Sequence, residues 1–397
     1  MRKLFRKIRQ KRFNYKSLID VLIYKDNLLN NLNEFKKLNS NVDIAPVLKS
    51  NAYGHGLIEI AKILDPIRNK TQTQVSAISN GASPQNIPFL IVDSYYEAMI
   101  LRNEEIKSKI LIIGYSLEEN ILNSKLKNVA FTIGSLEQLE NLSKNLKTKT
   151  KFHIKFDTGM HRNGFLISEI EMAIEIIKSN QNIFIEGICS HFADADGDDS
   201  GYTIDQIEKW NEIVKIWKEN FSETIYYHIS ATAGSMFSGS INANAMRLGI
   251  GLYGINVSLD DRLNLKPVLE MKSVISSIKE IKKGNKVGYN TTFTAEKDMK
   301  IANIPVGYYE GVDRRLSNNG FLKIKNKFCP IIGIVSMNIT TIDVTDTEQV
   351  KIGDEVVIIS SNSNDENSVT KIAKKCNTIP YEILVHIPER LKRIVAD

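Results

Sequence analysis

Residues 43–56 read DIAPVLKSNAYGHG, a short apolar run that ends at Lys49 and continues into a turn rich in small residues. The run 42–49 has the length and composition of a buried β-strand. Similar short runs recur along the chain as far as residue 255, and amphipathic stretches separate them. This alternation predicts repeated βα units around a parallel sheet.

The number of candidate strands indicates the architecture. They lie at 42–49, 88–93, 109–114, 129–133, 151–157, 183–191, 224–229 and 245–253. Eight parallel strands close a (β/α)8 TIM barrel. The intervening segments have helical spacing, as at Ile170, Ala173, Ile174 and Ile177. We therefore predict an α/β fold whose barrel spans residues 18–258.

The pattern changes after about residue 260 to alternating segments without long amphipathic helices. It predicts a mostly antiparallel β domain at 259–397, interrupted by one helix near 369–376. Residues 70–87 exceed the usual length of a βα connection, so we expect an inserted surface loop there.

Composition excludes several classes of protein. Of the 397 residues, 42% are hydrophobic and 25% are charged, and no apolar run is long enough to span a membrane. Disordered and membrane-embedded chains are therefore excluded. The three cysteines, Cys189, Cys329 and Cys376, are too few and too scattered for a disulfide framework. We expect a cytoplasmic protein.

The net charge of +6 comes from the N-terminus, because the first sixteen residues hold eight Lys and Arg and no acid. The remaining residues sum to −2, which makes a nucleic-acid-binding function the weakest hypothesis. We interpret residues 1–17 as a basic extension, either solvated or in weak contact with an anionic surface.

The carboxyl ends of barrel strands normally carry the active site. Lys49 stands at such an end, where it is a candidate Schiff-base amine or, with equal weight, a lysine that reaches out to solvent. Arg162 follows the fifth strand and suits carboxylate recognition, or is a surface residue at a helix entry. His153 and His228 are more typical of packed, hydrogen-bonded residues than of ligands. The histidines show no zinc-binding spacing, so no metal is expected.

The last two strands indicate a phosphate site. Small and hydroxyl-bearing residues at 230–234 follow the seventh strand, and Arg247, Leu248 and Gly249 end the eighth. Backbone N–H groups and hydroxyls at these two strands form the usual phosphate site of this fold.

Together, segments 49–56, 155–164, 190–192 and 247–254 closely resemble those of the alanine racemases, pyridoxal-phosphate enzymes built from a barrel and a β domain. The resemblance runs from about residue 18 to the C-terminus, and KSNAYGHG is similar to the family's lysine motif. It implies an isomerase that interconverts L-alanine and D-alanine by a two-base mechanism and supplies D-alanine for peptidoglycan.

The resemblance also implies roles for residues that bind pyridoxal 5'-phosphate. Lys49 would carry the cofactor as a Schiff base. Arg247 would face the pyridine nitrogen, with His191 behind it. Because arginine keeps its proton, the ring would be a weaker electron sink and side reactions would be limited. The phosphate would be held by Tyr53, Thr232, Gly249, Ile250 and Tyr381.

Racemisation needs a base on each face of the substrate, and the resemblance assigns them to Lys49 and Tyr289. In the family this tyrosine reaches the other subunit's site, which implies a homodimer with Tyr289 acting in trans. Arg162 and the backbone N–H of Met337 would bind the substrate carboxylate, and Tyr308 would line the entrance. Lys155 matches a position that many members carry as a carbamate.

Three positions depart from the family pattern: Ser50 replaces the usual alanine, Ala231 a common asparagine, and Asn338 the usual aspartate. The last two would change hydrogen bonding near the cofactor or substrate. The alternatives are a racemase of serine or broader preference and, less favoured, a decarboxylase or a non-catalytic pyridoxal-phosphate-binding protein. Arg247 argues against the decarboxylase, and the β domain with Tyr289 argues against the non-catalytic protein.

Overall fold

The computed structural model describes residues 16–65, 87–197, 199–257 and 262–397. The described chain forms two compact units: one is Tyr24–Val268, and the other combines Leu269–Ala396 with the described residues 16–23. The basic extension as far as residue 15, and the expected insertion at 70–87 apart from Ile87, lie outside the described residues.

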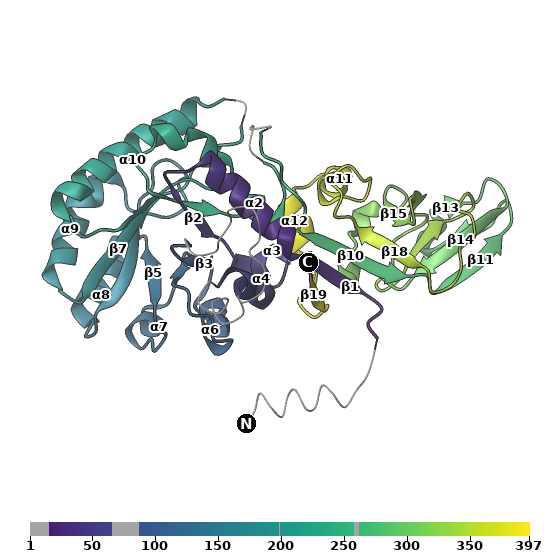
Figure 1. The fold of residues 1–397 in the computed structure, drawn as a ribbon, viewed down its shortest axis with the longest axis horizontal. Coiled ribbons are helices and arrows are strands. Elements are labelled where there is room, and N and C mark those ends of the chain that lie inside the picture. The colour runs from purple at the N-terminus through teal and green to yellow at the C-terminus, as the bar shows by residue number, and fades with distance from the viewer. Residues whose placement is uncertain (1–15, 66–86, 198, 258–261) are drawn as a thin grey trace, which may run out of the picture. The chain divides into compact units, whose positions relative to one another are not determined.

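In the described part of the first unit, eight strands form the predicted barrel, which confirms the fold class (Figure 1). Strands β3 to β8 make a parallel sheet in sequence order, and β2 pairs in parallel with β9. Val47, just past β2, bridges Ile91 of β3, and the Arg247 N–H of β9 donates to the Ser230 carbonyl just past β8 (3.0 Å). These contacts close the ring. The strands are β2 (Asp43–Pro46), β3 (Leu90–Val92), β4 (Ile110–Ile112), β5 (Val129–Ile133), β6 (Thr150–Lys155), β7 (Ile183–Cys189), β8 (Tyr226–His228) and β9 (Ala245–Leu248).

Helices follow the strands and bury one apolar face each. In α9 the buried residues are the predicted Ile170, Ala173, Ile174 and Ile177, and α10 buries Trp210 and Trp217 completely. Burial of such side chains stabilises the unit by about 1.5–3 kcal/mol each. The helices are α2 (Lys25–Leu38), α3 (Lys49–Tyr53), α4 (Leu57–Leu64), α6 (Tyr95–Asn103), α7 (Glu118–Leu122), α8 (Leu136–Asn145), α9 (Ile170–Ser179) and α10 (Gly201–Asn220), with short 3-10 turns η2 (Ile167–Glu169), η3 (Ala233–Ser240) and η4 (Ile250–Tyr253).

The second unit consists mainly of antiparallel β-structure, as predicted. Its larger sheet has the order β16-β15-β18-β10-β1-β19, and a smaller one has the order β11-β14-β17. Its elements are β1 (Asp20–Tyr24), β10 (Leu269–Val274), β11 (Ser277–Ile281), β12 (Lys286–Val287), η5 (Tyr289–Thr291), β13 (Phe293–Thr294), β14 (Met299–Ile304), η6 (Tyr308–Glu310), η7 (Arg314–Leu316), β15 (Phe321–Ile324), β16 (Lys327–Pro330), β17 (Thr340–Asp343), β18 (Glu355–Ile359), α11 (Val369–Lys375), α12 (Pro380–Val385) and β19 (Arg393–Ala396).

Strand β1 differs from the expected domain boundary. We expected the barrel to start at residue 18, whereas β1 pairs antiparallel with β10, placing Asp20 opposite Lys272 and Ile23 opposite Leu269. The reason is the alternation of the strand, since Val21 and Ile23 are fully buried on one face while their neighbours are partly exposed. The chain therefore contributes its first strand to the β domain before it enters the barrel.

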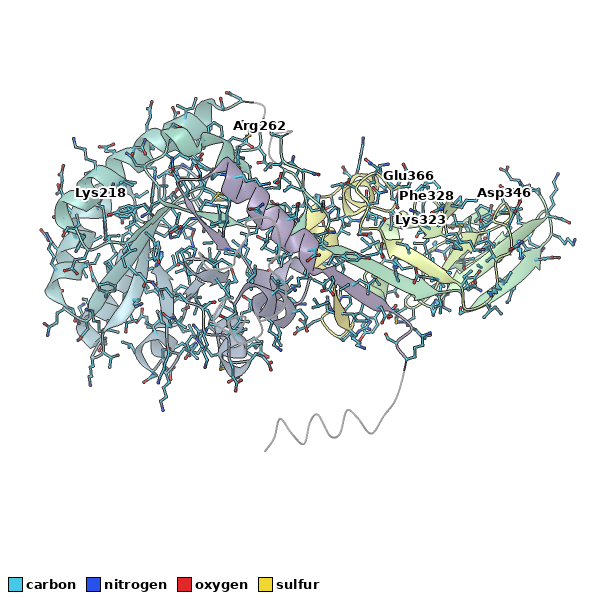
Figure 2. All side chains as sticks on the ribbon, in the orientation of Figure 1. Lys218, Arg262, Lys323, Phe328, Asp346 and Glu366 are labelled. Atoms are coloured by element: carbon cyan, nitrogen blue, oxygen red, sulfur yellow. The ribbon has the colours of Figure 1, made fainter. Side chains whose placement is uncertain are left out.

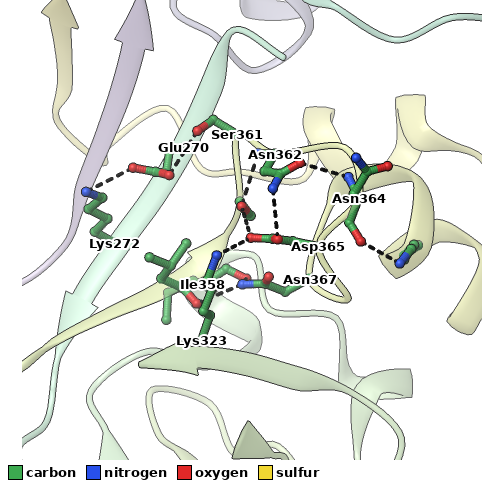
Figure 3. A network of polar contacts seen from close by, with 12 residues as sticks. Glu270, Lys272, Lys323, Ile358, Ser361, Asn362, Asn364, Asp365 and Asn367 are labelled. Carbon is green, nitrogen blue, oxygen red and sulfur yellow. Dashed lines mark hydrogen bonds and ion pairs between the residues drawn. The ribbon is translucent and has the colours of Figure 1, made fainter. Parts of the chain in front are cut away.

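A polar network fixes the loop between β18 and α11 (Figure 3). The Asp365 carboxylate accepts hydrogen bonds from Lys323 Nζ (2.7 Å), Ser360 Oγ (2.7 Å) and Asn362 Nδ2 (3.1 Å). Lys323 Nζ also lies 5.6 Å from the centroid of the Phe328 ring (Figure 2). These bonds satisfy the buried Asp365 carboxylate within the protein, so Ser360, Asn362 and Asp365 have a structural role in this loop.

Among the helices of the described ranges, none combines the length and the apolarity needed to cross a lipid bilayer.

Candidate active site

Lys49 opens α3, directly after the first barrel strand, and its backbone enters an unusual turn. The next four residues, Ser50, Asn51, Ala52 and Tyr53, all have left-handed φ angles of 56°, 55°, 52° and 52°. Each non-glycine residue in this conformation costs about 1–2 kcal/mol. Such backbone strain persists only where surrounding contacts hold it, and it is often found at functional sites.

Glu97 of α6 holds this turn. Its Oε1 accepts the backbone N–H of Ser50 (2.7 Å) and of Asn51 (3.4 Å), while its Oε2 accepts those of Asp93 (2.7 Å) and Ser94 (3.4 Å). Ser94 in turn caps α6, because its Oγ accepts the Glu97 N–H (3.2 Å). One carboxylate thus ties the turn after Lys49 to the end of β3. Our sequence reasoning missed Glu97, although the Ser-x-x-Glu spacing of a capping box was a signal for it.

The far end of the turn contacts the start of η4. A Cβ added to Gly249 would lie 2.7 Å from the Tyr53 hydroxyl, so only glycine leaves room for that hydroxyl. Thr232 Oγ1 accepts the N–H of Gly251 (3.2 Å) and is buried. The structure therefore brings together the hydroxyls of Tyr53 and Thr232 and the backbone where Gly249 leads into Ile250. This cradle fits the phosphate group of the cofactor that the resemblance implies.

Arg247 is buried and held from several sides. Its Nη1 donates to His228 Nδ1 (2.7 Å) and to the His228 carbonyl (2.9 Å). Its Nη2 donates to the carbonyls of Ser190 (2.7 Å) and Ile229 (2.8 Å) and to His191 Nδ1 (3.0 Å). The guanidinium is therefore fixed by the ends of β7 and β8, and His191 lies against it.

Positive charges converge around His191. The pKa of His191 lies well below its ordinary value, first because of burial and then because of Arg247, Arg162, Lys155 and Lys49. Its imidazole is neutral at physiological pH for this reason. Burial also lowers the pKa of Lys155, and Arg162 and Arg247 add to the effect. The cationic side chains around this neutral imidazole favour anionic groups such as a phosphate and a carboxylate.

The remaining predicted site residues belong to the β domain. Tyr289 lies in the turn between β12 and β13, and 69% of its side chain is exposed within its own chain. Tyr308 and Met337 are brought together, since the Tyr308 N–H donates to the Ser336 carbonyl (3.1 Å) and the Tyr309 N–H to the Met337 carbonyl (2.9 Å). Tyr381 lies on α12 and is partly buried.

A buried carboxylate, also missed from the sequence, supports this part of the β domain. Glu310 accepts the Gly307 N–H at Oε2 (3.0 Å) and both Asn338 Nδ2 (2.9 Å) and Arg390 Nη2 (3.0 Å) at Oε1. It joins the segment that carries Tyr308 to the loop that carries Met337. Asn338, one of the departures from the family pattern, is therefore a hydrogen-bond donor to Glu310 in this chain.

Comparisons with known proteins cover nearly the whole chain. Residues 23–257 match the family described as "Alanine racemase, N-terminal domain", and residues 268–395 match "Alanine racemase, C-terminal domain". The alanine racemase of Methanococcus maripaludis is 34% identical over 92% of this chain and 95% of its own length, and that of Fusobacterium nucleatum is 36% identical over 94% and 98%. The solved alanine racemase of Clostridium difficile 630 superposes with a TM-score of 0.84 at 29% identity, over 96% of this chain and 97% of its own.

Proposed function

This chain belongs to the alanine racemase family, and from that premise we propose that it interconverts L-alanine and D-alanine with pyridoxal 5'-phosphate as cofactor. The family depends on this cofactor, and the activity is that of an isomerase. The observation that carries the proposal is the set of cations around His191, with Arg247 in contact with it (3.0 Å) and Arg162 and Lys49 adding to the burial that lowers its pKa, together with the Tyr53–Gly249 cradle. These cations and backbone groups match the two anions involved, the cofactor phosphate and the substrate carboxylate.

The barrel residues would hold the cofactor. Bound pyridoxal phosphate supplies an electron sink that acidifies the Cα–H bond of an attached amino acid. Lys49 would hold it covalently, while Tyr53, Thr232, Gly249 and Ile250 of the barrel and Tyr381 of the β domain would bind its phosphate. Arg247 would face the pyridine nitrogen. Since its five N–H groups can only donate, it would bind that nitrogen as an acceptor and leave it unprotonated.

Two bases would move the proton at Cα. The Lys49 amine would serve one face, for the D-enantiomer, and the Tyr289 hydroxyl the other, for the L-enantiomer. The exposure of Tyr289 within its own chain supports an assembly in which it enters the site of a second copy. The active protein would therefore be a homodimer with Tyr289 acting in trans.

Arg162, Met337 and Tyr308 would bind and admit the substrate. Arg162 suits the carboxylate because its guanidinium can donate two parallel hydrogen bonds, and the Met337 N–H would donate a further one. Lys155 donates to Asn163 Oδ1 beside Arg162. Its lowered pKa favours the neutral amine, which is the form that adds carbon dioxide and loses a proton to give a carbamate. The product would serve peptidoglycan synthesis from the cytoplasm.

An absorption spectrum followed by an exchange assay tests this function. Protein purified with pyridoxal phosphate is expected to show a visible band that Lys49→Ala abolishes. In deuterium oxide, L-alanine should exchange its α-hydrogen and lose optical rotation, and faster than L-serine does. Faster turnover of L-serine would favour a racemase of serine preference. A band without racemisation of either amino acid would contradict the proposal.

A further inference from the structure

Behind Arg247, three polar side chains continue through the barrel interior. His228 Nε2 lies 2.7 Å from His153 Nδ1, and His153 Nε2 lies 3.8 Å from Glu186 Oε2. Both histidines are fully buried, Glu186 is 3% exposed, and Arg247 is 7% exposed. The four residues come from the consecutive strands β6, β7, β8 and β9. We name Arg247, His228, His153 and Glu186 the arginine relay.

Three local features bring His153 into this line. The pairing register of β6 and β7 shifts between Phe152 and His153, as at a β-bulge. On β7, a Cβ added to Gly187 would lie only 2.6 Å from His153 Nδ1. Phe89 packs edge-on against the His153 ring, with 5.4 Å between the ring centroids. A barrel interior is usually filled by branched apolar residues, so a polar row built in this way calls for a function beyond packing.

Hydrogen-bond chemistry gives the relay a direction. Arginine can only donate, so His228 Nδ1 must accept and cannot carry a proton. The proton of neutral His228 then lies on Nε2 and is donated to His153 Nδ1. His153 must in turn carry its own proton on Nε2, which lies 3.8 Å from Glu186 Oε2, too far for a hydrogen bond but close enough for the carboxylate charge to favour that proton. In support of neutral rings, burial and then the charge of Arg247 keep the pKa of His228 well below its ordinary value, and burial lowers that of His153.

The far end of the relay is a fixed negative charge. Glu186 Oε1 accepts from Lys151 Nζ (2.8 Å) and Lys109 Nζ (3.1 Å). Burial raises the pKa of Glu186, but the side chains of His153 and Lys151 and the charge of Lys109 outweigh it and lower the pKa to about 2. The relay therefore runs from a permanent cation, through two donors aligned in one direction, to a permanent anion.

We propose that Glu186, His153 and His228 are positioning residues, which select the histidine tautomers that hold Arg247 in place for the cofactor's pyridine nitrogen. The role in catalysis rests on the proposed function, whereas the tautomers are a property of the protein alone. Either tautomer would leave the rings buried and packed, but only one presents an acceptor to Arg247. Simple packing therefore predicts no dependence of the tautomer on Glu186.

Glu186→Gln is the decisive change. With the new amide oxygen accepting from Lys109 and Lys151, the NH2 group would face His153 Nε2 in place of the carboxylate charge and favour an acceptor there. Both histidines would then have to switch tautomer, and His228 would present an N–H to the N–H groups of Arg247. Asp65→Asn is the matched control, because Asp65 is also a buried barrel carboxylate but binds the Lys107 N–H (2.9 Å) and Ser108 Oγ (3.0 Å) outside the relay.

The tautomers are measured by two-bond proton–nitrogen correlation NMR on the full chain labelled with 15N-histidine, with and without pyridoxal phosphate. In the wild type and in Asp65→Asn, His228 and His153 are expected as neutral Nε2–H tautomers. In Glu186→Gln the His153 signal should change to Nδ1–H, and kcat for L-alanine should fall about tenfold while KM stays within about twofold.

A wild-type His228 protonated at Nδ1, which needs no variant to detect, would overturn the relay. An unchanged His153 tautomer in Glu186→Gln would overturn the part played by Glu186. If the tautomers are as expected but the protein does not racemise alanine, the alignment of the relay is upheld and the proposed function is refuted.

Discussion

Replacing Glu97 by Gln should weaken cofactor binding without touching a residue of the cofactor site. The four left-handed residues after Lys49 together cost about 4–8 kcal/mol, at about 1–2 kcal/mol each. Glu97 offsets part of this cost through its bonds to the N–H groups of Ser50 and Asn51. A hydrogen bond to a charged group contributes about 1.5–3 kcal/mol, and the 2.7 Å bond to Ser50 is the stronger of the two.

In Glu97→Gln one carboxylate oxygen becomes an NH2 group, which must face either the turn or the N–H groups at the start of α6. A loss of about 2–3 kcal/mol at the turn lowers the equilibrium constant for its binding conformation by about 30- to 150-fold. The dissociation constant of pyridoxal phosphate, measured by titrating the apoprotein, should rise by a similar factor. Glu104→Gln is the control, because Glu104 stands at the end of the same helix and pairs with Lys62 (3.0 Å).

A rescue experiment separates the turn from a general loss of stability. Glycine adopts the left-handed conformation without the steric cost, so Ser50→Gly should recover about tenfold of the affinity lost in Glu97→Gln. The reasoning is refuted if Glu97→Gln binds pyridoxal phosphate as tightly as the wild type does, or if the glycine fails to rescue it.

Three further predictions follow from the described contacts. Asn338→Asp should raise KM for L-alanine about tenfold, because it places a second carboxylate against that of Glu310. Adding Glu310→Gln should return KM to the wild-type value, as steady-state kinetics of the single and double variants would show. Gly249→Ala should weaken pyridoxal-phosphate binding about tenfold or more, because its Cβ would displace the Tyr53 hydroxyl. Gly239→Ala is the control: its Cβ would meet nothing within 4 Å, so this variant should bind normally in the same titration. The unfolding free energy should fall as pH drops below about 6.5, because His153, His191 and His228 have lowered pKa values and the unfolded chain binds protons that the folded chain excludes. The loss is up to about 1.4 kcal/mol per pH unit for each of the three. Urea midpoints that stay constant from neutral pH down to about pH 5 would contradict this.

The sequence was sufficient to predict the number of barrel strands and the position of Lys49 at the end of the first one. Both depend on local patterns, since buried parallel strands give short apolar runs and the chain must turn after each of them. The second helix of the β domain, α12, and the last strand, β19, were not predicted. Pro380 at the first turn of α12 was a local signal for that helix.

Features set by distant partners could not be predicted in this way. The alternation of β1 suits either unit, and only its pairing with β10 assigns it to the β domain. No propensity indicates four successive left-handed residues, because Glu97, which stabilises them, lies 47 residues after Ser50. His153 and His228 are packed and hydrogen-bonded, as predicted, but their alignment between Arg247 and Glu186 depends on the register shift of β6.

The most direct test of the two-base account is complementation between two inactive variants. Lys49→Ala lacks one base and Tyr289→Phe lacks the other, so each homodimer should racemise alanine hardly at all. If Tyr289 acts in trans, a heterodimer of the two variants contains one complete site. Co-expressed chains that assemble at random should then recover about a quarter of the wild-type rate, because about half of the dimers are mixed and each of these has one of its two sites intact. Recovery near this level is the predicted result. The two-base mechanism in trans is contradicted if heterodimers are shown to form and the mixture stays as inactive as its parents. It is also contradicted if either parent variant racemises alanine normally.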